Sequence, residues 1–166
     1  MTHGGEVECS AHGEMPKLRL IPIDRSGSPS DANLQLDDCS REVCSATASL
    51  YEKVGYASPW LGYLAVFNER IVGACSFKGP PASSKVEIAY FTFPEFEGRG
   101  VATSMARELL TLAMAAGPGI IVTAQTLPQR NASTAILEKL GFKRNGMGVD
   151  PEVGEVWEWE LPENVA

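Results

Sequence analysis

The sequence has 166 residues, of which 44% are hydrophobic, and this size predicts one globular domain that buries about two-thirds of its unfolded surface. Its 21 acidic and 14 basic residues give a net charge of −7, which argues against a general nucleic-acid binder and against binding to anionic membranes. No stretch is long and apolar enough for a membrane span, and the first residues lack the pattern of a signal peptide, so we expect a cytoplasmic protein.

Residues 1–15 are polar, contain glycine and show no periodicity, so they predict a disordered tail before a single domain over residues 16–166. His3, Cys9 and His12 could serve as soft metal ligands, but no fourth partner has a clear spacing, and we expect no metal. The sequence contains four scattered cysteines without a framework for disulfides, which predicts free thiols.

The first half of the chain begins with a predicted strand over residues 18–23, where apolar residues alternate up to a proline. A loop rich in serine, asparagine and aspartate follows. Apolar residues at helical spacing then predict a helix over residues 37–53, with Asp37 or Asp38 as its cap. Gly55 is expected to end this helix.

Three strands follow in the sequence. The strands over residues 62–67 and 71–77 are separated by a short turn, which predicts a hairpin. The third strand, over residues 86–93, is rich in β-branched and aromatic residues, and Pro94 ends it because proline has no backbone donor to continue a ladder.

A glycine turn joins this third strand to a helix. Gly98 and Gly100 allow a tight turn and a close approach of the backbone to a ligand, and apolar residues then recur at helical spacing up to Gly117. The first turn of a helix has free N–H groups and the positive end of the macrodipole, so a phosphate or pyrophosphate is its natural occupant. On its own, however, such a glycine pair also closes many ordinary turns.

The last part of the chain is predicted to form a buried strand over residues 120–124, apolar on both faces, and a helix over residues 131–140 that Gly141 closes. Two final strands are predicted over residues 142–149 and 155–161. The whole order is strand, helix, three strands, helix, strand, helix and two strands, which is typical of a mixed α/β sheet.

Two motifs in this order resemble a known family. The segment Glu97-Gly98-Arg99-Gly100-Val101-Ala102 resembles the Gln/Arg-x-x-Gly-x-Gly/Ala motif of the GNAT superfamily of acetyl-CoA-dependent N-acetyltransferases. Residues 126–142 are similar to the family's second cofactor-side segment, in the form used by the ribosomal-protein N-terminal acetyltransferase (RimJ/RimL-like) branch. The resemblance covers roughly residues 60–161. One departure is Glu97, a carboxylate where the family has glutamine or arginine.

The resemblance implies a GNAT fold, with a central mixed, mostly antiparallel sheet whose fourth and fifth strands splay apart and with helices on both faces. It also implies that acetyl-CoA is the cosubstrate. Backbone N–H groups of Phe91, Thr92 and Phe93 would hold the thioester and the pantetheine arm. The diphosphate would lie on a set of residues in the glycine turn and the next helix, and an asparagine further on would also contact the cofactor: Gly98, Arg99, Gly100, Val101, Ala102 and Thr103, and Asn131.

Acetyl transfer to an amine requires a neutral nucleophile, donors for the oxyanion and a proton for the departing thiolate. Glu87 is the candidate base, because it shares a strand face with Ala89 and Phe91, and an apolar cleft there would raise its pKa toward neutrality. This strand also looks like the one that carries the catalytic glutamate in the histone acetyltransferase branch. The alternative is a structural glutamate at the rim of the sheet.

Ser133 is the candidate acid, because it matches the serine that the ribosomal-protein branch places near the thioester sulfur. It could equally cap the first turn of its helix. The tyrosine that the family often uses in this helix is absent, since Leu137 and Glu138 occupy that region. Tyr90 points to the other face of its strand and is expected in the core.

The sequence therefore predicts an N-acetyltransferase that moves acetyl directly from acetyl-CoA to a primary amine of a small molecule or of a protein N-terminus. The alternative is a GNAT-like module that binds acyl-CoA as a sensor or scaffold without turnover. A protein that binds ATP or NAD at the glycine turn is disfavoured, because the P-loop lysine and the dinucleotide spacing are missing. A homodimer is expected by family analogy alone, and the sequence does not identify the acceptor.

Overall fold

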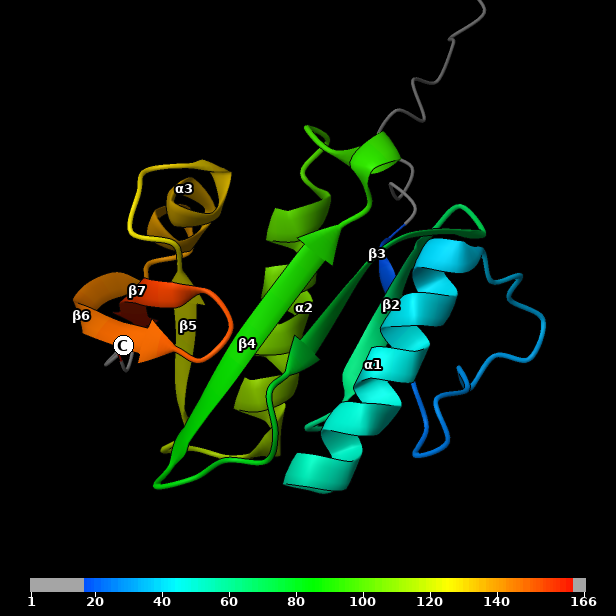
Figure 1. Ribbon diagram of the computed structural model, residues 1–166, viewed down its shortest axis with the longest axis horizontal. Helices are drawn as coiled ribbons and strands as arrows, with labels where there is room; N and C mark the ends of the chain where they lie inside the picture. Colours follow the sequence, from blue (N-terminus) through cyan, green and yellow to red (C-terminus); the bar gives the residue numbers. More distant parts are fainter. Residues whose placement is uncertain (1–16, 163–166) are drawn as a thin grey trace, which may run out of the picture.

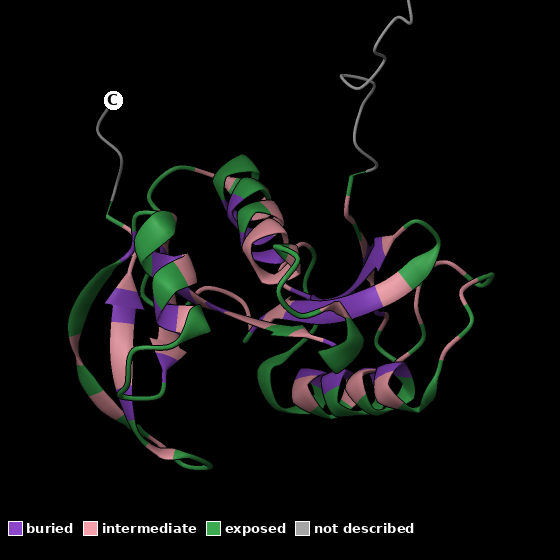
Figure 2. Ribbon diagram, turned by 90° about the horizontal axis from the view of Figure 1, so that it is seen from above, coloured by how far each residue is buried: buried purple, intermediate pink, exposed green. Residues whose placement is uncertain are grey.

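The computed structural model describes residues 17–162, so the predicted tail over residues 1–15 and the candidate ligands His3, Cys9 and His12 lie outside the described residues. One seven-stranded sheet has the order β1-β2-β3-β4-β5-β7-β6. Every neighbouring pair is antiparallel except β4–β5, which is parallel. Helix α1 covers one face of the sheet, and α2 and α3 cover the other (Figure 1, Figure 2). We call these the front face and the back face.

The strands and helices have the following bounds. The strands are β1 (Arg19–Pro22), β2 (Gly62–Phe67), β3 (Arg70–Phe77), β4 (Lys85–Thr92), β5 (Ile121–Thr126), β6 (Lys143–Asp150) and β7 (Gly154–Glu160). The helices are α1 (Asp38–Val54), α2 (Val101–Ala116) and α3 (Ala132–Lys139), with a short 3₁₀ turn, η2 (Pro94–Phe96), before the glycine turn. The predicted order of elements and the mixed α/β class are confirmed.

The boundaries differ from the prediction mainly at β5. This strand was expected to end at Ala124 and instead continues to Thr126. The extension arises because β7 keeps pairing with it, with Gln125 opposite Glu158 and Thr126 opposite Trp157. The expectation that β5 is apolar on both faces is also wrong, since buried and half-buried residues alternate along it.

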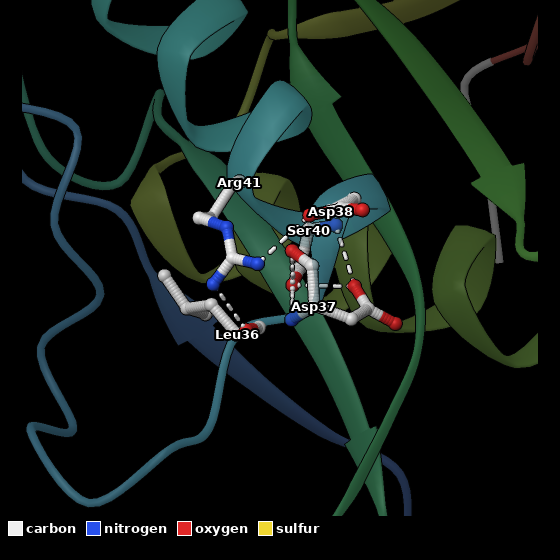
Figure 3. A network of polar contacts seen from close by, with 5 residues as sticks. All are labelled: Leu36, Asp37, Asp38, Ser40 and Arg41. Atoms are coloured by element: carbon white, nitrogen blue, oxygen red, sulfur yellow. Dashed lines mark hydrogen bonds and ion pairs between the residues drawn. The ribbon is translucent and has the colours of Figure 1, made fainter.

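Helix α1 begins at a reciprocal capping box. The Asp37 carboxylate accepts a hydrogen bond from the Ser40 backbone N–H at 2.8 Å, and the Ser40 hydroxyl accepts one from the Asp37 N–H at 2.9 Å. These bonds, first of all the one from the Ser40 backbone, lower the pKa of Asp37. Arg41 ties the entry to the helix by donating to the Leu36 carbonyl and to Asp38 (Figure 3). Of the two predicted caps, Asp37 is therefore the one used.

The central feature of the sheet is the short contact between β4 and β5. Their parallel register runs from Lys85 opposite Ile121 to Ile88 opposite Ala124 and then stops. Beyond this point β4 continues beside β3 as far as Thr92, while β5 continues beside β7. The two strands diverge towards their carboxyl ends (Figure 1). The splay that the resemblance implied is present.

The larger core fills the space between the back of the sheet and helices α2 and α3, where Met105, Leu109, Leu137 and Phe142 are almost fully buried. A smaller core lies around Ile23, Leu64 and Phe93. Cys39, Cys44 and Cys75 are free thiols, as predicted. Within residues 17–162, no helix has the length and apolar character needed to cross a bilayer.

One buried tyrosine ties α1 to the sheet. The Tyr51 hydroxyl donates to the Ile23 carbonyl at 2.7 Å and accepts from the Gly62 backbone N–H at 2.9 Å. The Gly62 carbonyl in turn accepts a hydrogen bond from the Ile23 N–H at 2.9 Å, so the hydroxyl bonds the two remaining backbone groups of this residue pair. The Tyr51 hydroxyl therefore links α1 to the first two strands, in addition to the apolar packing of the helix on the sheet.

Replacing Tyr51 with phenylalanine should lower the free energy of unfolding by about 1–3 kcal/mol, because it leaves a buried N–H and a buried C=O without their partner. Urea denaturation measures this difference. The matched control is Tyr56→Phe, since the Tyr56 ring packs on the Tyr51 ring at 5.0 Å but lies at the surface, and its loss should stay below about 0.5 kcal/mol. Equal losses in the two variants would contradict the role given to the Tyr51 hydroxyl.

Candidate functional site

The splay opens into a cleft of about 660 Å³ on the back face, between the end of β4, the glycine turn and the first turns of α2 and α3. Eight predicted site residues line it: Phe91, Thr92, Gly98, Gly100, Val101, Ala102, Thr103 and Ser133. Six further residues complete the lining: Tyr90, Phe96, Glu97, Ala132, Ala135 and Ile136. The structure therefore brings both sequence motifs to one cleft.

The glycine turn is open to the cleft. Gly98 and Gly100 have φ angles of +75° and +78°, and a Cβ placed on either would meet no heavy atom within 4 Å. Such φ angles favour glycine, and the open space allows a ligand to approach the backbone closely. The prediction that this turn needs glycine is confirmed.

The first turn of α2 has no side-chain cap, because its N-cap is Gly100. Helices α1 and α3 differ, since capping boxes at Asp37 and Asn131 satisfy their first N–H groups. At α2 the first N–H group that has a partner within the helix is that of Ser104, which donates to the Gly100 carbonyl at 3.1 Å. The N–H groups of the first turn therefore remain available to an anion in the cleft.

The backbone of β4 presents a free edge to the cleft. Phe93 N–H donates to the Val72 carbonyl at 3.0 Å and Lys78 N–H donates to the Glu87 carbonyl at 2.8 Å, so the odd-numbered residues of this stretch face β3. The amides of Tyr90 and Thr92 face the side that β5 has left. The predicted backbone donors are thus corrected: Thr92 N–H is available, whereas the amides of Phe91 and Phe93 face β3.

Tyr90 packs against the larger core, as predicted, and also lines the cleft. Its ring is half-buried, and its hydroxyl lies 3.4 Å from the backbone carbonyl oxygen of Ser133, at the limit of a hydrogen bond. Burial raises the pKa of Tyr90 to about 12, so the phenol stays protonated at neutral pH. Strand alternation correctly placed this side chain on the face opposite Glu87, but alternation alone does not show that the side chain also borders the cleft.

At the start of α3, the structure separates the roles predicted for Asn131 and Ser133. The Asn131 side chain accepts a hydrogen bond from the Thr134 backbone N–H at 3.1 Å and is the helix cap, and it does not line the cleft. Ser133 is half-buried in the cleft wall and does not cap the helix, so the capping alternative is wrong. Arg99 is exposed and is likewise absent from the lining.

Glu87 lies on the front face, outside the cleft. Its carboxylate forms an ion pair with Lys78, with Nζ and Oε2 2.7 Å apart, and its side chain is 25% exposed. It borders a small hollow of about 200 Å³ that also contains Thr123 and Gln125. The apolar surroundings predicted for Glu87 are therefore wrong, because Lys78 and polar β5 side chains surround it.

A second hollow, of about 270 Å³, lies on the front face between α1 and strands β3 and β4. Val43, Thr47 and Leu50 of α1 form one wall, and Ala89, Tyr90 and Phe91 lie on the β4 side. Tyr90 and Phe91 therefore border both this front hollow and the cleft. The free end of β4 is a common wall between two spaces on opposite faces of the sheet.

Two other features complete the description of the site. A hollow of about 570 Å³ between residues 31–39 and η2 shares only Phe96 with the cleft. Among residues 17–162, no group of three or more histidine, cysteine, aspartate or glutamate side chains is arranged to hold a metal ion.

Solved structures with the same fold include acetyltransferases. The RimL ribosomal L7/L12 alpha-N-protein acetyltransferase in complex with coenzyme A is 19% identical, with a TM-score of 0.63, and the match covers 87% of this chain and 93% of that one. A GNAT-family acetyltransferase from Bacillus anthracis is 14% identical, with a TM-score of 0.62 and coverage of 89% and 96%. The microcin C7 self-immunity acetyltransferase MccE, in complex with acetyl-CoA and AMP, is 16% identical, with a TM-score of 0.58 and coverage of 78% and 73%.

No curated protein sequence matches this chain at a significant level. A family model does match, and its description is "Acetyltransferase (GNAT) domain". The match spans residues 28–143, which contain the glycine turn, the splayed strands and α3. The chain therefore belongs to the GNAT acetyltransferase family and is an acyltransferase by membership.

Proposed function

We propose that this protein is an acetyl-CoA-dependent N-acetyltransferase that transfers acetyl directly from the thioester to a primary amine. The observation that carries the proposal is the common wall at Tyr90 and Phe91, because it separates a cleft suited to the cosubstrate from a hollow on the opposite face. The structural neighbours bound to coenzyme A and to acetyl-CoA support the choice of cosubstrate.

In this proposal, the diphosphate of acetyl-CoA binds the N–H groups of Gly98 to Thr103. The uncapped first turn of α2 supports this, since it combines free donors with the positive end of a 16-residue helix. The pantetheine arm runs along the free edge of β4 and accepts hydrogen bonds from backbone N–H groups. Arg99 and Asn131 contact the cosubstrate only if their side chains move into the cleft, because neither lines it in the free protein.

The acceptor amine approaches from the front hollow and reaches the thioester past the common wall. The backbone N–H groups of Tyr90 and Thr92 on the free edge are suited to stabilise the oxyanion. A donor of this kind contributes about 3 kcal/mol of transition-state stabilisation. Glu87 takes up the amine proton through water. It stands on β4 one residue before the last pair of the β4–β5 register. The Ser133 hydroxyl donates a hydrogen bond to the thioester sulfur.

The identity of the acceptor stays open between a small amine and a protein N-terminus. The front hollow is lined mainly by apolar groups of α1, β3 and β4, which supports an acceptor with an apolar portion beside its amine. The homodimer and the cytoplasmic location stay predictions.

Calorimetric titration of the full chain with CoA tests the first half of the proposal, and release of free thiol from acetyl-CoA over a panel of primary amines tests the second. We expect CoA to bind and thiol release to require an amine. Absence of CoA binding would refute the proposal. Binding without thiol release would instead support the acyl-CoA sensor, the alternative favoured by the carboxylate of Glu97 in the cleft lining.

The substitution Gly100→Glu should raise the Kd for CoA about 100-fold or more, because it places a carboxylate beside the diphosphate site and forces a side chain onto a φ of +78°. The matched control is Gly119→Glu, which adds the same charge at a φ of +86°, also with no heavy atom within 4 Å, beyond the other end of α2. Calorimetry on both variants measures the difference. Equal weakening in the two variants would show that the loss comes from backbone strain or net charge rather than from the site.

Glu87→Gln should lower kcat by about 100-fold, as for loss of a general base, and leave the Kd for CoA within a factor of about two. The control is Glu160→Gln on the same face, since Glu160 also pairs with a lysine, Lys85, at 3.3 Å and borders the same small hollow. Steady-state rates with a saturating amine are measured across the pH range. A full rate for Glu87→Gln at every pH would remove Glu87 from the mechanism.

A further inference from the structure

The reaction needs a proton donor for the thiolate that leaves when the carbon–sulfur bond breaks. The cleft lining within the described residues offers hydroxyl groups on Tyr90, Thr92, Thr103 and Ser133. Thr103 lies in the first turn of α2, beside the proposed diphosphate site. Tyr90 and Ser133 lie together across the cleft, near the point where β4 and β5 separate. A phenol is the stronger acid of these two groups.

The bonding of the Tyr90 hydroxyl differs from that of the other two tyrosines whose hydroxyls are bonded. Tyr51 and Tyr63 donate to backbone carbonyl oxygens at 2.7 and 2.6 Å, so these hydroxyls hold the fold together. The Tyr90 hydroxyl lies 3.4 Å from the Ser133 carbonyl oxygen, a contact too long to contribute much stability. The Tyr90 O–H is therefore positioned over the cleft and can turn to a ligand at small cost.

The place of Tyr90 in the sheet supports the same role. Its backbone faces the gap left by β5, and it borders both the cleft and the front hollow. The acetyl group must pass between these two spaces, so the thioester sulfur has to lie beside this wall when the amine attacks from the front. Tyr90 is the only hydroxyl-bearing residue in the described part of the chain that borders both spaces, and its hydroxyl lies on the cleft side, near Ser133.

We propose that Tyr90 is the catalytic acid that protonates the departing thiolate, an inference that rests on the proposed function. The amine nitrogen bonds to the acetyl carbon, and the carbon–sulfur bond breaks with its electron pair on sulfur. The Tyr90 O–H proton goes to sulfur, which gives free CoA thiol. The proton that the amine nitrogen loses then passes through water to the Tyr90 phenolate, so the charges balance. Ser133 then orients the sulfur and does not supply the proton.

The test compares acetyl-CoA with its selenium analogue, acetyl-seleno-CoA, on wild type and on Tyr90→Phe. A selenol is far more acidic than a thiol, so selenolate leaves without a proton donor. Hydroxylamine is the acceptor probe, because it is a small uncharged nucleophile at neutral pH and needs no specific recognition, and the uncatalysed rate is subtracted. We expect Tyr90→Phe to lower kcat with acetyl-CoA by about 100-fold and with acetyl-seleno-CoA by less than about threefold.

Three outcomes would overturn the proposal. An equal loss with both substrates shows a structural role for the phenol. The ratio of the rates with the two substrates does not depend on how much of the variant is folded. A loss confined to Ser133→Ala and rescued by selenium assigns the proton to Ser133. A wild type that binds CoA in calorimetry but does not accelerate thiol release refutes the proposed transfer as well, whereas the first two outcomes leave it standing. Tyr56→Phe is the control for loss of a surface hydroxyl.

Discussion

The whole site depends on a parallel pairing that lasts only from Lys85–Ile121 to Ile88–Ala124. Each of the two strands has another partner that continues further, since β3 accompanies β4 to Thr92 and β7 accompanies β5 to Thr126. Both strands therefore stay within the sheet while their common edge opens. Backbone N–H and C=O groups on that edge lack strand partners, and buried polar groups of this kind need partners from elsewhere. In the proposed function that partner is the cosubstrate, and the cleft is the space that would receive it.

The ends of the helices show the same division between structure and site. At α1 and α3, the side chains of Asp37 and Asn131 each accept a hydrogen bond from an N–H group of the first turn. At α2 a glycine stands at the cap position and the donors stay open. Glycine in place of a capping side chain costs only about a few tenths of a kcal/mol, a cost that a bound anion can offset. Open backbone donors are thus found both at the first turn of α2 and on the free edge of β4, which border the same cleft.

Local signals in the sequence were sufficient for most of the fold. The aspartate before α1, the glycines of the turn and the alternation in β4 all act through neighbouring residues, so the pattern alone revealed them. The errors concern relations between distant segments. Tyr90 packs on the core as expected, but alternation alone could not show that it also lines the cleft where β5 leaves β4. Glu87 was given apolar surroundings because its partner, Lys78, comes from the end of the preceding strand. Asn131 and Ser133 both suit a helix start, and only the hydrogen bonds distinguish cap from cleft wall.

Phe91 has 52% of its surface exposed although it stands near the centre of the sheet, with its ring 5.8 Å from that of Phe93. An aromatic side chain in this place is costly for the empty protein, because water must solvate it on a surface that no other element covers. If cosubstrate and acceptor fill the two spaces beside it, as proposed, this ring loses its contact with water. Occupancy should therefore be accompanied by a drop in heat capacity, and it should make the protein less prone to self-association than it is when empty.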